Sequence, residues 1–151
     1  MLATVIPGTW LKKYYNRWYF NYSMSQSPIF AKTYDLLLWL IPRTTTFPRE
    51  QRFVLARRVQ DIVLRFQECL IEAAVLPQQS RPAKLEWLNQ ADVELTKLRF
   101  HLRLCRDLNL LDAGQHQHVS RMIDEIGRLL GGWFKSLDGV SSKQILADLP
   151  Q

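Results

Sequence analysis

The sequence predicts an all-α protein, an antiparallel four-helix bundle of up-down-up-down topology, and three observations support this fold class. Apolar residues recur at spacings of three and four along four segments, as in amphipathic helices. Prolines and glycines separate these segments by short connections, which place successive helices antiparallel. The chain has 151 residues, 47 % of them hydrophobic, which is enough for one domain with its own core.

The first two helices are expected over residues 28–41 and 48–76. Pro42 lacks an amide hydrogen and disfavours helical geometry in the residue before it, so the first helix should end there. The second should begin at Pro48, whose missing donor costs nothing in a first turn, with Glu50 near the positive end of the dipole. The expected apolar stripes are Tyr34, Leu37, Leu38 and Ile41 in the first helix and Leu55, Val59, Ile62, Phe66, Cys69 and Ala73 in the second.

The third and fourth helices are expected over residues 82–110 and 115–134. Ser80 is a candidate cap for the third helix, and Asn109 and Gly114 mark the turn that follows it. The main stripe of the third helix is Leu88, Ala91, Leu95, Leu98, Leu102 and Cys105, and that of the fourth is Val119, Met122, Ile123, Ile126, Leu129, Leu130 and Trp133.

The bundle is thus predicted over residues 28–135, with a segment outside it on either side. Residues 136–151 contain Ser, Asp and Gly and are expected to form a loose tail. Residues 1–27 combine many aromatic side chains with three cations and no acid. Such a segment could stack on bases or lie at a membrane surface. We favour a third interpretation, an extension outside the fold that consists of sequence upstream of a translation start at Met24.

Charge and cysteine usage narrow the class of partner and compartment. The net charge of +6 and the pI near 9.6 permit a polyanionic partner such as nucleic acid, but a basic domain without one fits equally well. Cys69 and Cys105 lack metal-site spacing and fall on apolar stripes, so buried thiols in a reducing compartment are expected. Because the sequence shows neither a membrane-spanning run nor a signal-peptide pattern, we expect a cytoplasmic protein.

The third helix carries a second apolar face, nearly opposite its core stripe. Its members are Val93, Phe100, Leu104, Leu108 and Leu111. One core cannot reach both faces, and an exposed apolar band of this kind usually marks an interface. Scattered surface apolar residues are the alternative, but self-association is favoured, which makes this face a candidate oligomer interface. A weaker band on the second helix consists of Phe53, Leu64, Ile71 and Val75.

A row of cations lies between the two apolar faces of the third helix. It consists of Arg99, Arg103 and Arg106, and Lys97 lies nearby, on the margin of the second apolar face. No acid occurs from Thr96 to Arg106, so these cations are expected to lack partners along their own helix and to attract an anion. Attraction to the negative end of the helix dipole is the alternative. On the second helix the charges alternate in sign from Arg58 to Glu68, which indicates ion pairs on a solvated face.

Catalytic and metal-binding motifs are not visible, and neither an enzyme nor a cofactor is expected. A di-metal bundle needs Glu-x-x-His pairs, and the sequence has none. Phosphate-binding loops and hydrolase motifs are also missing. His116 and His118 project about 200° apart on a helix, so they do not share a metal ion easily. His101 is expected to be a surface or interface residue.

Three motifs carry a resemblance to a known family: YDLLLWL from Tyr34 to Leu40, FPREQRF from Phe47 to Phe53, and GRLLGGW from Gly127 to Trp133. With the segments between them, they resemble the accessory variability determinant (Avd) family of diversity-generating retroelements. That family belongs with four-helix-bundle proteins that include those encoded in ribosomal-RNA intervening sequences. The resemblance covers residues 30–136, and the aromatic N-terminal segment departs from the family pattern.

The resemblance implies a basic homopentamer without chemistry of its own that binds RNA and DNA and associates with the retroelement's reverse transcriptase. That complex copies template-repeat RNA with mutations at adenines, and the cDNA diversifies a variable gene. The ring's basic surface would correspond here to Arg99, Arg103 and Arg106 with Lys97, and to Arg49, Arg57 and Arg58 as second choices. The alternatives are a structural bundle that binds only proteins, and a membrane-surface protein anchored through residues 10–22.

Overall fold

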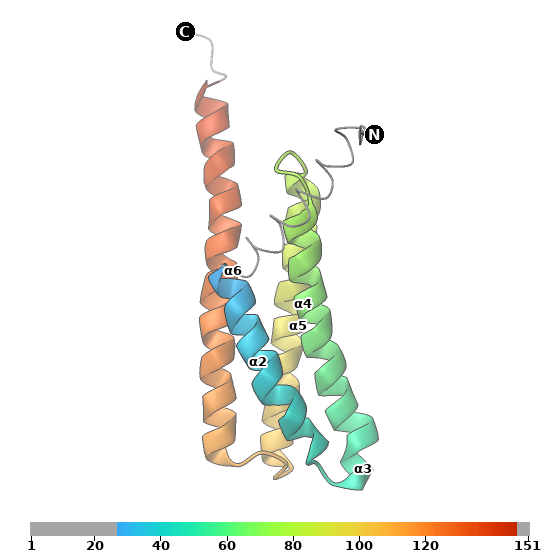
Figure 1. Cartoon of the computed structure of the whole chain (residues 1–151). Coiled ribbons are helices and arrows are strands. Elements are labelled where there is room, and N and C mark those ends of the chain that lie inside the picture. The colour runs from blue at the N-terminus through green and yellow to red at the C-terminus, as the bar shows by residue number, and fades with distance from the viewer. Residues whose placement is uncertain (1–26, 148–151) are drawn as a thin grey trace, which may run out of the picture.

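The computed structural model describes the backbone of residues 27–147 and the side chains of residues 27–139, which form a four-helix bundle (Figure 1). Its elements are α2 (Pro28–Thr45), α3 (Arg49–Gln51), the π-helix η1 (Arg52–Ala56), α4 (Arg57–Val75), α5 (Arg81–Asp107) and α6 (Ala113–Ala147). Because α3, η1 and α4 follow one another without a break, they form the second helix of the bundle. Successive helices run antiparallel and residues 27–147 contain no strand, so the predicted fold class is confirmed.

The core is built from one stripe of each helix. Every member of the main stripes predicted for the second and third helices is buried. From α6 the core receives Val119, Ile123, Ile126 and Leu130. The other predicted members, Met122, Leu129 and Trp133, are half-buried, and Trp133 meets Phe30 of α2 edge to face with ring centroids 6.4 Å apart.

The stripe predicted for the first helix is wrong for two of its four members, since Leu37 packs against the core and Ile41 is half-buried. Tyr34 and Leu38 are exposed, and the buried residues are Ile29, Thr33, Leu36, Leu40 and Thr44. Two threonines can occupy this stripe because their hydroxyls donate to carbonyls of the same helix, Thr33 Oγ1 to Ile29 O at 2.7 Å and Thr44 Oγ1 to Ile41 O at 2.8 Å. Gln60 of α4 also donates to Thr44 Oγ1, at 2.7 Å, which joins α2 to α4.

The first helix also does not end at Pro42, because α2 continues to Thr45. Pro42 is exposed, so its ring meets solvent on that side. The last turn is stabilised by threonine hydroxyls, since Thr45 donates to the carbonyl of Pro42 at 2.6 Å and Thr46 to that of Arg43 at 2.7 Å. Carbonyls that would lack a helical amide are thereby satisfied.

The turn between α5 and α6 ends α5 at Asp107 and changes the direction of the chain. Asn109 adopts a left-handed conformation with φ of 58°. Its amide donates to Arg106 O at 2.9 Å and the amide of Leu110 to Cys105 O at 2.8 Å, which is the Schellman pattern that ends helices. Asp112 then caps α6 reciprocally, because its carboxylate accepts from the amide of Gln115 at 2.7 Å and Gln115 Oε1 accepts from the amide of Asp112 at 3.1 Å.

The predicted loose tail from residue 136 is wrong for its first part, because α6 runs through Gly131 and Gly132 to Ala147. An internal glycine costs a helix about 1 kcal/mol without ending it. Arg81 at the start of α5 pairs with Asp138 at 2.8 Å, and Leu137 packs against the core. The predicted N-terminal segment and residues 148–151 lie outside the described part of the chain, except for Ser27.

Smaller predictions are also settled by the fold. Cys69 and Cys105 are free, buried thiols, as expected. Ser80 occupies the position before α5, but its hydroxyl makes no capping hydrogen bond. Of the helices over residues 27–147, none combines the length and apolar character needed to cross a membrane.

Candidate nucleic-acid interface

The arginine row lies on the side of α5 that faces α6. Nη2 of Arg99 is 3.5 Å from Oδ1 of Asp124 on α6, so the side of α5 that carries Arg99 is turned toward α6. Arg103 follows one turn later, with Nε 3.9 Å from Oδ2 of Asp107. Arg106, in the last turn of α5, forms no ion pair with the residues that the structure describes. The three arginines therefore lie along one side of α5, as the sequence predicts.

The expectation that these cations lack partners along their own helix is wrong for Lys97, which pairs with Glu94, and for Arg103. Its partner Asp107 lies one residue beyond the acid-free stretch, at the i+4 position, where helical side chains meet. Both ion pairs of the row are long, and the exposed fraction of the side chain is 43 % for Arg99 and 78 % for Arg103. Exposed pairs of this kind contribute about 0–1 kcal/mol. The guanidinium groups of Arg99 and Arg103 therefore remain available to a phosphate, which they can bind through several donors.

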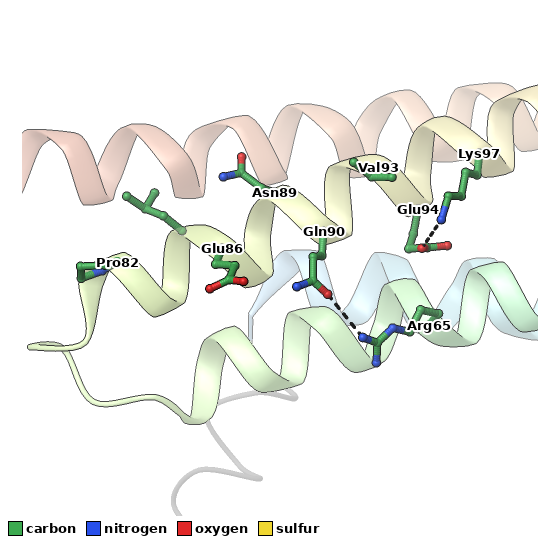
Figure 2. A pocket seen from close by; sticks show the side chains of 9 residues that line it. Arg65, Pro82, Glu86, Asn89, Gln90, Val93, Glu94 and Lys97 are labelled. Atoms are coloured by element: carbon green, nitrogen blue, oxygen red, sulfur yellow. Dashed lines mark hydrogen bonds and ion pairs between the residues drawn. The ribbon is translucent and has the colours of Figure 1, made fainter.

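Lys97 does not belong to the row, because it lies on the opposite side of α5. Its ammonium Nζ is 2.7 Å from Oε1 of Glu94, at the groove between α4 and α5 (Figure 2). Across this groove Arg65 of α4 donates to Oε1 of Gln90 at 3.3 Å and lies over the ring of Trp87. Cations and acids alternate along the groove, so it offers a polyanion no net attraction.

The second-choice cations Arg49, Arg57 and Arg58 are exposed on α3 and the start of α4. Arg49 lies at the same end of the bundle as Arg106, because the α2–α3 corner and the α5–α6 turn share that end (Figure 1). Arg58 instead borders the α4–α5 groove with Asp61. Arg49 is therefore close to the end at which the arginine row finishes, whereas Arg58 faces the groove on the other side of α5.

Sequence reasoning missed two cations of α6, Arg121 and Arg128. Both are exposed and lie within one turn of Asp124, on either side of it. By sequence alone the spacing Arg121, Asp124 and Arg128 indicates a solvated ion-pair ladder. Only the contact between Arg99 and Asp124 shows that these residues lie near the row on α5.

The second apolar face of α5 is exposed except at its last member. The exposed fractions are 52 % for Val93, 69 % for Phe100, 36 % for Leu104 and 48 % for Leu108, but 3 % for Leu111. Leu111 is wrongly assigned to this face, because α5 ends at Asp107 and the left-handed turn at Asn109 directs the chain back to the core. On α4 and η1, Phe53, Leu64 and Val75 are exposed as expected, and Ile71 is half-buried.

The arginine row and the apolar face lie on a bundle that matches a known family over residues 28–137, from the first residue of α2 into α6. The chain belongs to the bAvd-like family. This match confirms the resemblance to accessory variability determinant proteins. All candidate residues, from Arg49 to Leu111, fall within the bAvd-like region, and residues 1–27 do not. Comparison with curated proteins gives no match.

The histidines of this bAvd-like chain are involved in packing. The ring of His118 packs at a tilt of 44° against Trp39 of α2, with ring centroids 5.1 Å apart, and Arg43 lies 5.1 Å from the centre of the same tryptophan ring. His101 Nδ1 is 2.8 Å from the carbonyl of Lys97. Among the described residues, no three His, Cys, Asp or Glu side chains converge as metal ligands.

Proposed function

We propose that this bAvd-like protein is a non-catalytic accessory protein of a diversity-generating retroelement. As a basic oligomer it binds RNA or DNA and the element's reverse transcriptase, and it supports mutagenic cDNA synthesis. The observation that carries this proposal is the family match, which spans the whole bundle from residue 28 to residue 137.

The charge distribution supports a phosphate-binding role. The chain carries a net charge of +6, and the exposed residues Arg99, Arg103 and Arg106 lie on successive turns of α5. Contacts of arginine with phosphate are independent of base sequence and release counterions. Binding should therefore be strongly salt-dependent and only weakly sequence-dependent.

Replacement of Arg99, Arg103 and Arg106 by Gln tests the proposal. Glutamine removes the charge without placing a new acid beside Asp124 and Asp107. We expect weaker binding to single-stranded template-repeat RNA, and a slope of log affinity against log salt that falls by about 0.7 for each phosphate that the variant no longer neutralises. Fluorescence anisotropy over a salt series measures both quantities, and circular dichroism checks that the helices persist.

The matched control replaces Arg49, Arg57 and Arg58 by Gln, which changes the net charge by the same amount. If both triple variants lose affinity equally, the row on α5 is not the specific determinant of binding. Wild-type protein that does not bind RNA at low salt would overturn the nucleic-acid part of the proposal.

The association with reverse transcriptase needs its own test. The enzyme encoded beside this protein's gene should co-purify with it, and a template repeat with a matching variable repeat should lie nearby. The second candidate function, a structural bundle that binds only proteins, is favoured by the exposed Phe100 and its apolar neighbours. It predicts association that salt barely affects and no retention on RNA.

A further inference from the structure

Gly127 of α6 lies directly beneath the guanidinium group of Arg99. A Cβ atom at position 127 would be 2.9 Å from Nη2 of Arg99 and 3.8 Å from Cδ2 of Leu95. The first distance is shorter than a Cβ contact allows, so the arginine can occupy this position only because residue 127 has no side chain. The same Nη2 atom is 3.5 Å from Oδ1 of Asp124, about one turn earlier on α6.

Among the glycines of α6, only Gly114 in the first turn has another close neighbour, with a Cβ position 3.3 Å from Oδ1 of Asp112. A Cβ atom at Gly131, Gly132 or Gly139 would meet nothing within 4 Å. Each internal glycine costs a helix about 1 kcal/mol relative to alanine. At Gly127 the bundle has a steric reason for that cost, since the space of the missing side chain is filled by Arg99.

We infer that Gly127 and Asp124 form a seat on α6 that positions Arg99 for contact with nucleic-acid phosphate. This inference rests on the proposed function, and Gly127 and Asp124 act as positioning residues through Arg99. Asp124 contacts one of the five N–H donors of the guanidinium group through Nη2, which leaves other donors free. A side chain that is already held in place loses less conformational entropy when it binds a phosphate.

The test is a double-mutant cycle of Gly127→Ala and Arg99→Gln, with Gly131→Ala as the matched control. The atom that meets the new Cβ is the far end of a flexible side chain, so alanine should displace the guanidinium group and leave the fold intact. We expect Gly127→Ala to weaken binding of single-stranded RNA by about three- to tenfold, corresponding to part or all of one charge-assisted contact. In the Arg99→Gln background the same change should have no effect, and Gly131→Ala should have none in either background.

Thermal unfolding provides a second readout that does not depend on RNA. Gly131→Ala should raise the melting temperature, because alanine is the better helix former. Gly127→Ala should raise the melting temperature less while Arg99 is present, because the new Cβ meets its guanidinium group. In the Arg99→Gln background it should raise the melting temperature as much as Gly131→Ala does, because the shorter glutamine side chain does not reach position 127.

Two results would overturn the positioning role while the proposed function stands: equal loss of affinity from Gly127→Ala in both backgrounds, or loss from Arg99→Gln with none from Gly127→Ala. If the wild-type protein binds no RNA, the proposed function fails and the positioning role with it. The melting cycle then still shows whether the seat exists.

Discussion

Cys105 is buried in the bundle core, and this burial raises the pKa of its thiol from 9.0 to about 11. The cause is desolvation, since the surrounding side chains disfavour the thiolate. Burial also raises the pKa of Cys69, and the nearby Arg65 opposes this shift. Neither thiol should react readily in the folded protein at neutral pH.

The raised pKa of Cys105 predicts a loss of stability in alkaline solution. Above pH 9 the unfolded thiol loses its proton while the folded one keeps it until about pH 11. The contribution of the Cys105 thiol to the free energy of unfolding is therefore fully present below pH 9 and is lost as the pH rises through about 11. The free energy of unfolding falls by up to about 1.4 kcal/mol per pH unit in this range. Urea unfolding at pH 8, 9, 10 and 10.5 measures this slope. Cys105→Ala should be less stable overall but flatter between pH 9 and pH 11, and identical slopes in the two proteins would contradict the assignment.

At the level of helices, the end of α2 depends on an exposed proline and a run of threonines. Pro42 deprives Leu38 of a helical hydrogen-bond donor, yet the helix continues to Thr45 because the threonine hydroxyls satisfy the last carbonyls. This end fixes the corner at which Phe47 is buried between the first two helices of the bundle.

We therefore expect Pro42→Ala to stabilise the protein by about 1 kcal/mol. It restores a hydrogen bond worth about 0.5–1.5 kcal/mol and relieves the ring's conflict with the preceding turn, while the greater freedom of the unfolded chain offsets about 0.4–1 kcal/mol. Urea midpoints measure the change. Pro48→Ala is the control: Pro48 precedes α3 and costs no hydrogen bond, so this variant should be slightly less stable. Destabilisation by Pro42→Ala would mean that the corner needs the proline geometry.

At the scale of the whole molecule, the described residues expose large apolar side chains on α2, η1, α4 and α5. Contiguous apolar patches on soluble proteins usually mark interaction surfaces. The face of α5 with Val93, Phe100, Leu104 and Leu108 is the candidate for self-association, in keeping with the proposed oligomer.

We expect the variant Phe100→Asp with Leu104→Asp to shift the protein from an oligomer to a monomer with its helices intact. Buried aspartates without partners at an interface cost several kcal/mol each, whereas on an exposed face of the monomer they cost little. Light scattering coupled to size exclusion measures the mass. Gln117→Asp, at an exposed position of α6 outside this face, should leave the mass unchanged. A monomeric wild-type protein would contradict the assembly.

Periodicity in the sequence was enough to predict the fold class and the core faces of the second and third helices, because the stripe from Leu55 to Ala73 and that from Leu88 to Cys105 each alternate clearly with polar residues. It failed for α2, where apolar residues surround the helix and only packing against α4 and α6 decides which face is buried. It also failed at Leu111, where a left-handed residue redirects the chain after α5.

The partner of Arg99 lies on another helix, 25 residues away. The sequence by itself determined the number and order of the helices and the row of arginines on α5, since both are local patterns. The tertiary structure alone decided which helix faces meet and where Arg99 lies, because these depend on contacts between residues far apart in the chain.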